Sequence, residues 1–201
     1  MARNFDGVDD YLEATTAPVT AYPFTASCWF NLTSADGLRP LITIGTTGSG
    51  DHFWRLMARG DVTGDTLHFS SKDTVQVEAE TTTGYSINTW HHGCMIGRSA
   101  TDRSVYIDGG SRGNNTTSNS PSGMNRVRAG AAFGGGGSPG AFMVGRLAEA
   151  AIWNVDITDT EVAQLARGVA VLRMRPGNLK LYVPAYGINS PETDYSGNIT
   201  K

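Results

Sequence analysis

The chain has 201 residues, 25 of them glycine, which is typical of one all-β domain with many tight turns and is short for two domains. Sixteen basic and 19 acidic residues leave a formal net charge of -3, so the basic excess of a nucleic-acid-binding protein is missing. No run approaches the roughly 18 apolar residues that a membrane-spanning helix requires, and residues 1–6 contain no apolar core of a secretion signal. We therefore expect one domain over residues 1–201 that contacts neither nucleic acid nor a membrane.

Apolar side chains alternate with polar or aromatic ones along residues 24–32, and this period of two predicts a strand with one buried face. Shorter runs of the same kind predict further strands at residues 41–44, 53–58, 66–70, 75–79, 90–97, 104–108, 145–153 and 179–185. Cys28 and Cys94 are the only cysteines, and both lie in such strands. The sequence leaves open whether they form a disulfide or remain two buried thiols.

Two segments between the strands are rich in residues that favour turns. Residues 111–123 consist mostly of Asn, Ser, Thr and Gly, and residues 133–140 contain four consecutive glycines and a proline. We expect both segments to be surface loops because they have few apolar side chains to bury. Partner contacts are expected on these loops, with Gly135 and Gly137 among the contact residues.

One helix is predicted near residues 159–167. Thr158 and Glu161 have the spacing of a capping box, in which each residue satisfies a backbone N–H of the other at a helix start. Val162 and Leu165 follow with helical spacing, and Gly168 is a suitable stop.

Five segments in succession carry a family resemblance. They are an opening strand at residues 4–12, a strand that starts Phe-Thr and contains a Trp at residues 24–30, a Trp-His pair at residues 90–92 followed by Tyr-x-Asp-Gly at residues 105–109, a late strand and short helix at residues 145–162, and a terminal element at residues 194–198. Together they resemble laminin-G-like domains of the concanavalin A-like family. The resemblance implies an all-β fold, a two-sheet antiparallel jelly-roll sandwich with one short helix near residues 159–167.

This fold carries unrelated functions, including those of lectins, receptor-binding modules, glycosidases and viral structural proteins. The chain resembles the stand-alone laminin-G-like proteins encoded among phage structural genes. That resemblance implies a non-enzymatic virion accessory protein, such as a capsid decoration protein, which contacts other capsid proteins and forms homo-oligomers. The alternative function is that of a carbohydrate-binding, lectin-like module, with or without calcium, on an extracellular or cell-surface protein.

No catalytic residues are predicted. Glycosidases of this fold usually carry Glu-x-Asp-x-x-Glu on one strand, and the chain lacks this motif. Glu78 and Glu80 share one face of a predicted strand, where polar neighbours favour a solvated surface. His91 and His92 are adjacent on a strand, so they point to opposite faces and do not share a zinc ion.

Calcium is the one metal that the family resemblance suggests, because some members bind it through loop oxygens at the edge of the sandwich. The candidate ligands of this hard, oxygen-binding cation lie near the two ends of the chain: Asp6, Asp9, Asp10, Asp194 and Asn198. The alternative is that these residues form turns and caps. We expect that no cofactor is required for folding.

A glycan site needs an exposed aromatic ring that stacks on a sugar and polar groups that bind its hydroxyls. The sequence offers Trp54 with its neighbours His52 and Arg55, or Tyr22. The other tryptophans, Trp29, Trp90 and Trp153, are expected in the core.

Overall fold

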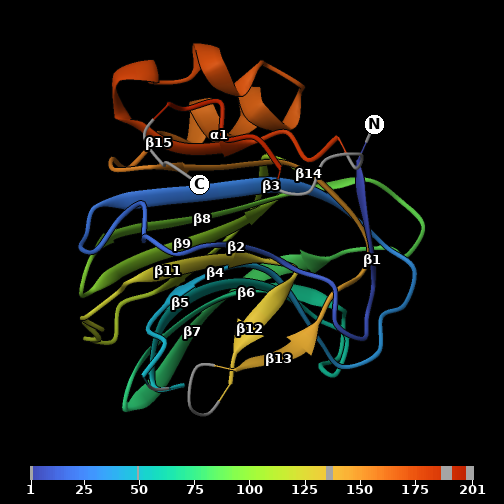
Figure 1. Ribbon diagram of the computed structural model, residues 1–201, viewed down its shortest axis with the longest axis horizontal. Helices are drawn as coiled ribbons and strands as arrows, with labels where there is room; N and C mark the ends of the chain where they lie inside the picture. The colour runs from blue at the N-terminus through green and yellow to red at the C-terminus, as the bar shows by residue number, and fades with distance from the viewer. Residues whose placement is uncertain (1, 49, 135–137, 187–191, 198–201) are drawn as a thin grey trace.

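The computed structural model describes residues 2–48, 50–134, 138–186 and 192–197. The chain forms two antiparallel sheets packed face to face, with helix α1 (Asp159–Ala166) on the outer side of one of them (Figure 1). The predicted jelly-roll sandwich and its short helix are both confirmed.

Sheet A has seven strands within the described residues. In spatial order they are β1 (Arg3–Asp6), β14 (Val144–Trp153), β3 (Phe24–Leu32), β8 (His91–Ser99), β9 (Asp102–Ile107) and β10 (Gly110–Asn115), and β15 (Leu179–Val183) is the seventh. Strand β1 pairs with the first half of β14, and β15 pairs with its second half.

Sheet B faces sheet A across the core. Its strands are, in spatial order, β2 (Leu12–Ala14), β11 (Arg126–Ala129), β4 (Leu38–Gly45), β5 (His52–Arg59), β6 (Thr66–Asp73) and β7 (Val75–Gly84). A separate hairpin of β12 (Ala131–Phe133) and β13 (Pro139–Phe142) lies beside β4.

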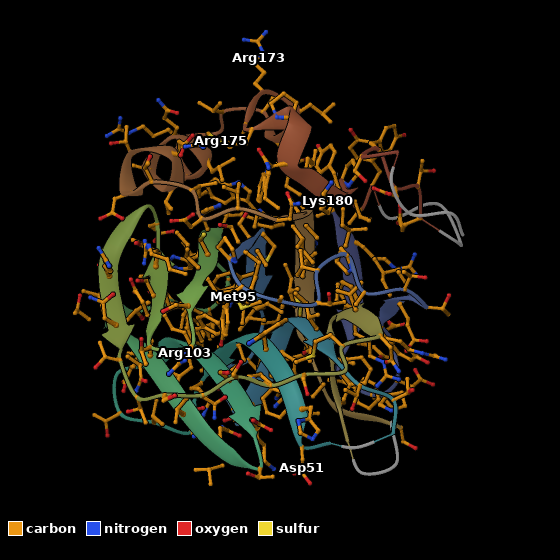
Figure 2. The ribbon with its side chains drawn as sticks, turned by 90° about the vertical axis from the view of Figure 1, so that its left-hand side faces the viewer. Asp51, Met95, Arg103, Arg173, Arg175 and Lys180 are labelled. Carbon is orange, nitrogen blue, oxygen red and sulfur yellow. The ribbon has the colours of Figure 1, made fainter. Side chains whose placement is uncertain are left out.

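The core between the sheets follows from the alternation that the sequence shows. In β3, Phe24, Phe30 and Leu32 are fully buried between the sheets, as predicted. Met95 of the neighbouring β8 lies in the same core, in the middle of the molecule (Figure 2). Such burial is the main favourable contribution to folding.

A second apolar cluster lies on the outer face of sheet A, where α1 and the short 3-10 helices Val171–Arg173 and Pro176–Asn178 cover it. Trp153 from β14 is fully buried there and contacts the cluster that includes Val162 and Leu165 of α1. This cover extends over only part of the outer face and leaves Trp90 and Arg146 exposed.

No helix of the described chain is both long and apolar enough to cross a membrane.

Two predicted loops are partly strands. Gly110–Asn115 forms β10, so the expected loop 111–123 was wrong over its first residues. The strand forms because its backbone pairs with β9, and Gly113 lets it pass so close to Glu80 that a Cβ would lie 1.6 Å from the Glu80 carbonyl oxygen. The expected loop 133–140 is bounded by the strands of the β12–β13 hairpin, and Gly135 and Gly137 lie outside the described residues.

Candidate functional site

The predicted aromatic platform around Trp54 does not exist. Trp54 is fully buried, its ring centroid lies 4.6 Å from that of Phe24, and its Nε1 donates a hydrogen bond to Tyr22 Oη at 2.9 Å. The prediction was wrong because alternation along β5 points Trp54 into the core and its neighbour Arg55 out of it. These two side chains therefore never share a surface.

The remaining residues of that prediction form local contacts. The guanidinium of Arg55 is nearly buried and stacks 4.0 Å from the ring centroid of Phe53, and burial lowers the pKa of Arg55 to about 10. His52 is half-buried with its Nδ1 3.1 Å from a carboxylate oxygen of Asp73. Neither residue is near an exposed aromatic platform of the kind predicted.

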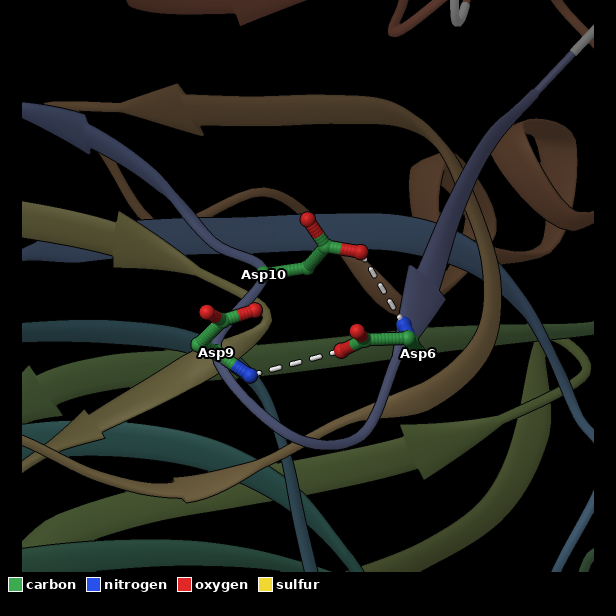
Figure 3. Close-up of side chains that lie close together, drawn as sticks. All are labelled: Asp6, Asp9 and Asp10. Carbon is green, nitrogen blue, oxygen red and sulfur yellow. Dashed lines mark hydrogen bonds between the residues drawn. The ribbon is translucent and has the colours of Figure 1, made fainter.

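The predicted calcium ligands are brought together only in part. Asp6, Asp9 and Asp10 lie in the turn between β1 and β2, with carboxylate oxygens within 4.8 Å of one another (Figure 3). Asp194 instead accepts hydrogen bonds from the backbone N–H groups of Tyr182 and Ser196, and Asn198 lies outside the described residues.

The acidic turn matches calcium in the kind of its ligands but not in their number. Oδ1 of Asp6 already accepts the N–H of Val8 at 2.8 Å. It also accepts the N–H of Asp9 at 3.3 Å, and Oδ2 of Asp10 accepts the N–H of Asp6 (Figure 3). The bond from Val8 is the main cause of the lowered pKa of Asp6. Since calcium takes six to eight oxygens, these carboxylates would leave most of its coordination to water.

Glu78 and Glu80 share the outer face of sheet B, as predicted, but Glu78 is not freely solvated. It accepts hydrogen bonds from Ser70 Oγ and from Gln76 Nε2 (2.7 Å), and its Oε2 lies 3.2 Å from His68 Nδ1. Burial raises the pKa of Glu78, but the hydrogen bonds from His68 and Ser70 outweigh it and bring the pKa to about 2. This carboxylate is therefore poorly suited to act as a general acid, which needs a pKa near the working pH.

The outer face of sheet A carries an exposed aromatic surface. A hollow of about 480 Å³ opens there beside α1's cover, and we call it the tryptophan hollow. It is lined by Ala2, Trp29, Trp90, Arg146 and Ala148. Trp90 is 40% exposed and Trp29 is partly exposed, so the predicted core position was wrong for Trp90 and incomplete for Trp29.

Strand register explains how these side chains meet. Trp29 and Asn31 occupy the outward phase of β3, because Cys28 and Phe30 point into the core. Asn31 lies opposite Arg146 of β14, and Arg146 lies opposite Asn4 of β1. Three strands that are far apart in the sequence thus present one polar row next to the tryptophans.

The residue after Trp90 in the chain, His91, takes part in a hydrogen-bonded pair with Asp108. His91 Nε2 accepts the backbone N–H of Ser86 at 3.0 Å, so Nδ1 carries the proton and donates to Asp108 Oδ2 at 2.7 Å. The other oxygen of Asp108 accepts the N–H of His92 at 2.9 Å. The Trp-His and Asp-Gly elements of the family resemblance therefore have a structural role, which fixes the start of β8.

A smaller hollow of about 100 Å³ lies on the other side of Trp29, towards the end of α1. His92 lines it and lies with its ring centroid 5.5 Å from that of Trp29. Burial lowers the pKa of His92 to about 4, so the ring is neutral at neutral pH, and its buried Nδ1 has no hydrogen-bond partner among the described residues. Glu149 also lines this hollow and accepts a hydrogen bond from Tyr182 Oη at 2.6 Å.

Another cavity, of about 400 Å³, opens between the edges of the two sheets. Its walls include Leu12, Val127 and Ile152, with Arg3 and Glu13 also among the lining residues. Charged groups of this cavity already pair with one another, Arg3 with Glu192 and Arg128 with Glu13, and no tryptophan lines it. The tryptophan hollow is therefore the better candidate for a polar ligand.

One sequence signal pointed to this site. Trp29 stands in the polar phase of the 24–32 alternation, among Thr25, Ser27 and Asn31. A large aromatic residue in that phase is either covered by another element or exposed on the surface, and the sequence does not show which. Nothing in the sequence marked Arg146 as a binding residue; it was only placed in the strand predicted at residues 145–153.

Comparisons with known proteins agree with this architecture. The model of the concanavalin A-like lectin/glucanases superfamily matches residues 6–163. Among curated protein sequences, none matches the chain.

Several solved structures share the fold. A putative carbohydrate binding protein from Bacteroides ovatus is 19% identical, with a TM-score of 0.67 over 98% of this chain and 56% of that one. The CBM40 of a Ruminococcus gnavus sialidase, solved with α2,3 sialyllactose, is 10% identical, with a TM-score of 0.61 over 83% of this chain and 98% of that one. The enzymatically active domain of tailspike protein 2 from bacteriophage CBA120 is 12% identical, with a TM-score of 0.67 over 90% of this chain and 29% of that one.

Identities this low show a shared fold and nothing more, whereas the family model covers most of the chain. The chain belongs to the concanavalin A-like lectin/glucanase superfamily.

Proposed function

We propose that the chain is a non-catalytic carbohydrate-binding domain whose sugar site is the tryptophan hollow. The observation that carries the proposal is the presence of an exposed tryptophan, a partly exposed tryptophan and an exposed arginine in one hollow on the outer face of sheet A. Indole rings offer flat apolar faces to the C–H face of a sugar ring, and the neighbouring polar side chains bind its hydroxyls. Arg146 and Asn31 are suitably placed for the second task.

Two further observations support this proposal. Structures named as carbohydrate-binding proteins share the fold of this chain. The paired carboxylates most suggestive of hydrolysis, Glu78 and Glu80, lie on the other sheet, and the low pKa of Glu78 disfavours its use as an acid.

A glycan array followed by calorimetry on the best ligand tests the proposal. Trp90→Ala is expected to weaken binding roughly tenfold or more, since stacking on an aromatic ring contributes about 1 kcal/mol beyond its area burial. Val75→Ala is the matched control, because Val75 is 69% exposed on sheet B and far from the hollow in the fold. An array without any bound glycan, or equal affinities for the two variants, would overturn the proposal.

The array should be run with calcium and with EDTA. We expect the same binding in both, because the acidic turn of Asp6, Asp9 and Asp10 belongs to the β1–β2 connection and not to the tryptophan hollow. Binding that disappears in EDTA would instead show that a divalent cation takes part in binding.

The virion function and self-assembly stay predictions. Their support is the fold shared with a phage tailspike domain. Light scattering on the purified chain measures its oligomeric state, and co-sedimentation with phage capsids tests the decoration role. A monomer without affinity for capsids would contradict both predictions and would leave carbohydrate binding untouched.

A further inference from the structure

We infer that the ligand of the tryptophan hollow is an acidic sugar whose anionic group pairs with Arg146. This inference rests on the proposed function. It deepens that function by naming the chemical class of the ligand.

Arg146 is the arginine that lines the tryptophan hollow, and its guanidinium is not used in a contact with the described residues. Most others pair with a carboxylate, for example Arg59 with Asp61 at 2.7 Å and Arg175 with Glu161 at 2.6 Å. The Arg146 side chain is exposed and makes no ion pair or hydrogen bond with any described residue. The side chains of Arg167 and Arg173 share this property, but neither lines either hollow. The guanidinium of Arg146 is therefore free to bind a ligand.

The immediate surroundings of Arg146 leave the positive charge uncompensated. Its cross-strand neighbours, Asn4 and Asn31, are neutral, and no residue that lines the tryptophan hollow is acidic. A guanidinium presents a planar fork of N–H donors that matches a carboxylate with two parallel hydrogen bonds. An anionic sugar that stacks on the tryptophans would place its acid within reach of this fork.

The charges on the two sides of Trp29 give the ligand a direction. Glu149 lines the smaller hollow, and His92 beside it is neutral at neutral pH because burial lowers its pKa. Arg146 is thus the one cation among the described lining residues of both hollows. The acidic end of a longer ligand belongs at Arg146, and its neutral end belongs near His92.

Calorimetry with matched pairs of ligands tests the inference. The pairs are sialyllactose and lactose, oligogalacturonate and its carboxyl-reduced form, and a sulfated galactan and its unsulfated form. The chain is expected to bind at least one acidic member about tenfold more tightly than its neutral partner, in the range of a charge-assisted hydrogen bond at an exposed site. The carboxylate and sulfate pairs show which anion is bound.

Variants at two exposed arginines separate the role of Arg146 from general charge. Arg146→Gln is expected to abolish the preference for the acidic ligand, because the acidic member of a pair loses its charged partner and the neutral member loses at most a hydrogen bond to a hydroxyl. Arg173→Gln is the matched control, because the Arg173 side chain is exposed and points away from the molecule on the far side of α1's cover (Figure 2). It removes the same charge and should leave the preference intact.

The outcomes distinguish the inference from the function on which it rests. Equal binding of acidic and neutral ligands, still weakened by Trp90→Ala, would overturn the acidic-sugar inference and keep the carbohydrate function. A preference that survives Arg146→Gln would also overturn the inference. Absence of binding to every acidic and neutral ligand would overturn both.

Discussion

At the scale of single residues, Gly145 shows how closely two neighbouring strands of sheet A approach each other. Its φ is +128°, and a Cβ at this position would lie 2.2 Å from the carbonyl oxygen of Asn31 and 2.8 Å from the Cα of Leu32. Glycine is needed both for the backbone conformation and for the close approach of β14 to β3. The residue next to it is Arg146, so the same close approach places the backbone of Arg146 beside β3.

Gly145→Ala is expected to lower the free energy of unfolding by about 3 kcal/mol, the sum of an overpacked contact and an unfavourable φ. Urea denaturation measures the change. Gly110→Ala is the control, because a Cβ there meets no atom within 4 Å, and it should change stability little. Equal stabilities of the two variants would contradict the packing argument.

Glu78 makes the stability of sheet B depend on pH. The folded pKa of Glu78 is about 2, although burial alone would raise it, and the unfolded value is near 4.5. A carboxyl with a lowered folded pKa stabilises the fold above its unfolded pKa, and this contribution is lost as the pH falls from about 4.5 towards 2.

Glu78→Gln should therefore be less stable than the unmodified chain at neutral pH, with a difference that shrinks as the pH approaches the folded pKa. Denaturant midpoints at neutral pH and at a pH between 2 and 4.5 measure it. A difference that stays constant over this range would contradict the low pKa of Glu78.

At the scale of elements, α1 is the clearest case of local sequence matching local structure. The capping box is present as predicted: Thr158 accepts the N–H of Glu161, and the Glu161 carboxylate accepts the N–H of Thr158 at 2.7 Å. Arg175 from the following segment also donates to Glu161 at 2.6 Å. The helix thus begins where the sequence indicates and is tied to the chain that continues from it.

Thr158→Ala is expected to cost about 1 kcal/mol of stability, the usual effect of losing an N-cap side chain. Thermal or denaturant unfolding measures this loss. Thr160→Ala in the same helical turn is the control, since Thr160 is exposed and makes no side-chain hydrogen bond in the described structure. If both variants lose the same stability, the cap is not the cause.

The edge strand β10 shows where element prediction from sequence failed. Its residues, Gly110–Asn115, carry turn-forming side chains, and no apolar alternation marks them. The strand exists because β9 supplies backbone partners and because Gly113 allows contact with β7. Edge pairing of this kind depends on neighbours that local sequence does not reveal.

At the scale of the whole molecule, the two cysteines show that sheet A is covered by an apolar cluster on each of its faces. Cys28 lies in the core between the sheets, and Cys94 lies in the cluster beneath α1, so they occupy opposite faces of one sheet. Both are fully buried free thiols. The disulfide that the sequence left open is therefore absent.

Neither thiol is expected to react with a thiol reagent in the native protein, because burial raises the pKa of both Cys28 and Cys94. Two thiols per chain should react after unfolding in guanidinium, and a reductant should leave the melting temperature unchanged. Rapid labelling of the folded chain, or a mass that indicates a disulfide, would contradict this arrangement.

The sequence by itself determined the class of fold and the helix. A period of two in the strands requires one buried face, and a capping box requires only residues three apart, so both follow from local chemistry. Only the tertiary structure decided which faces are covered. Trp54 is buried because sheet A packs on it. Trp90 is exposed because the cover that contains α1 does not reach it. Pairing between strands that are distant in the sequence brings together Arg146, Asn31 and the tryptophans. The local sequence does not predict the register of that pairing.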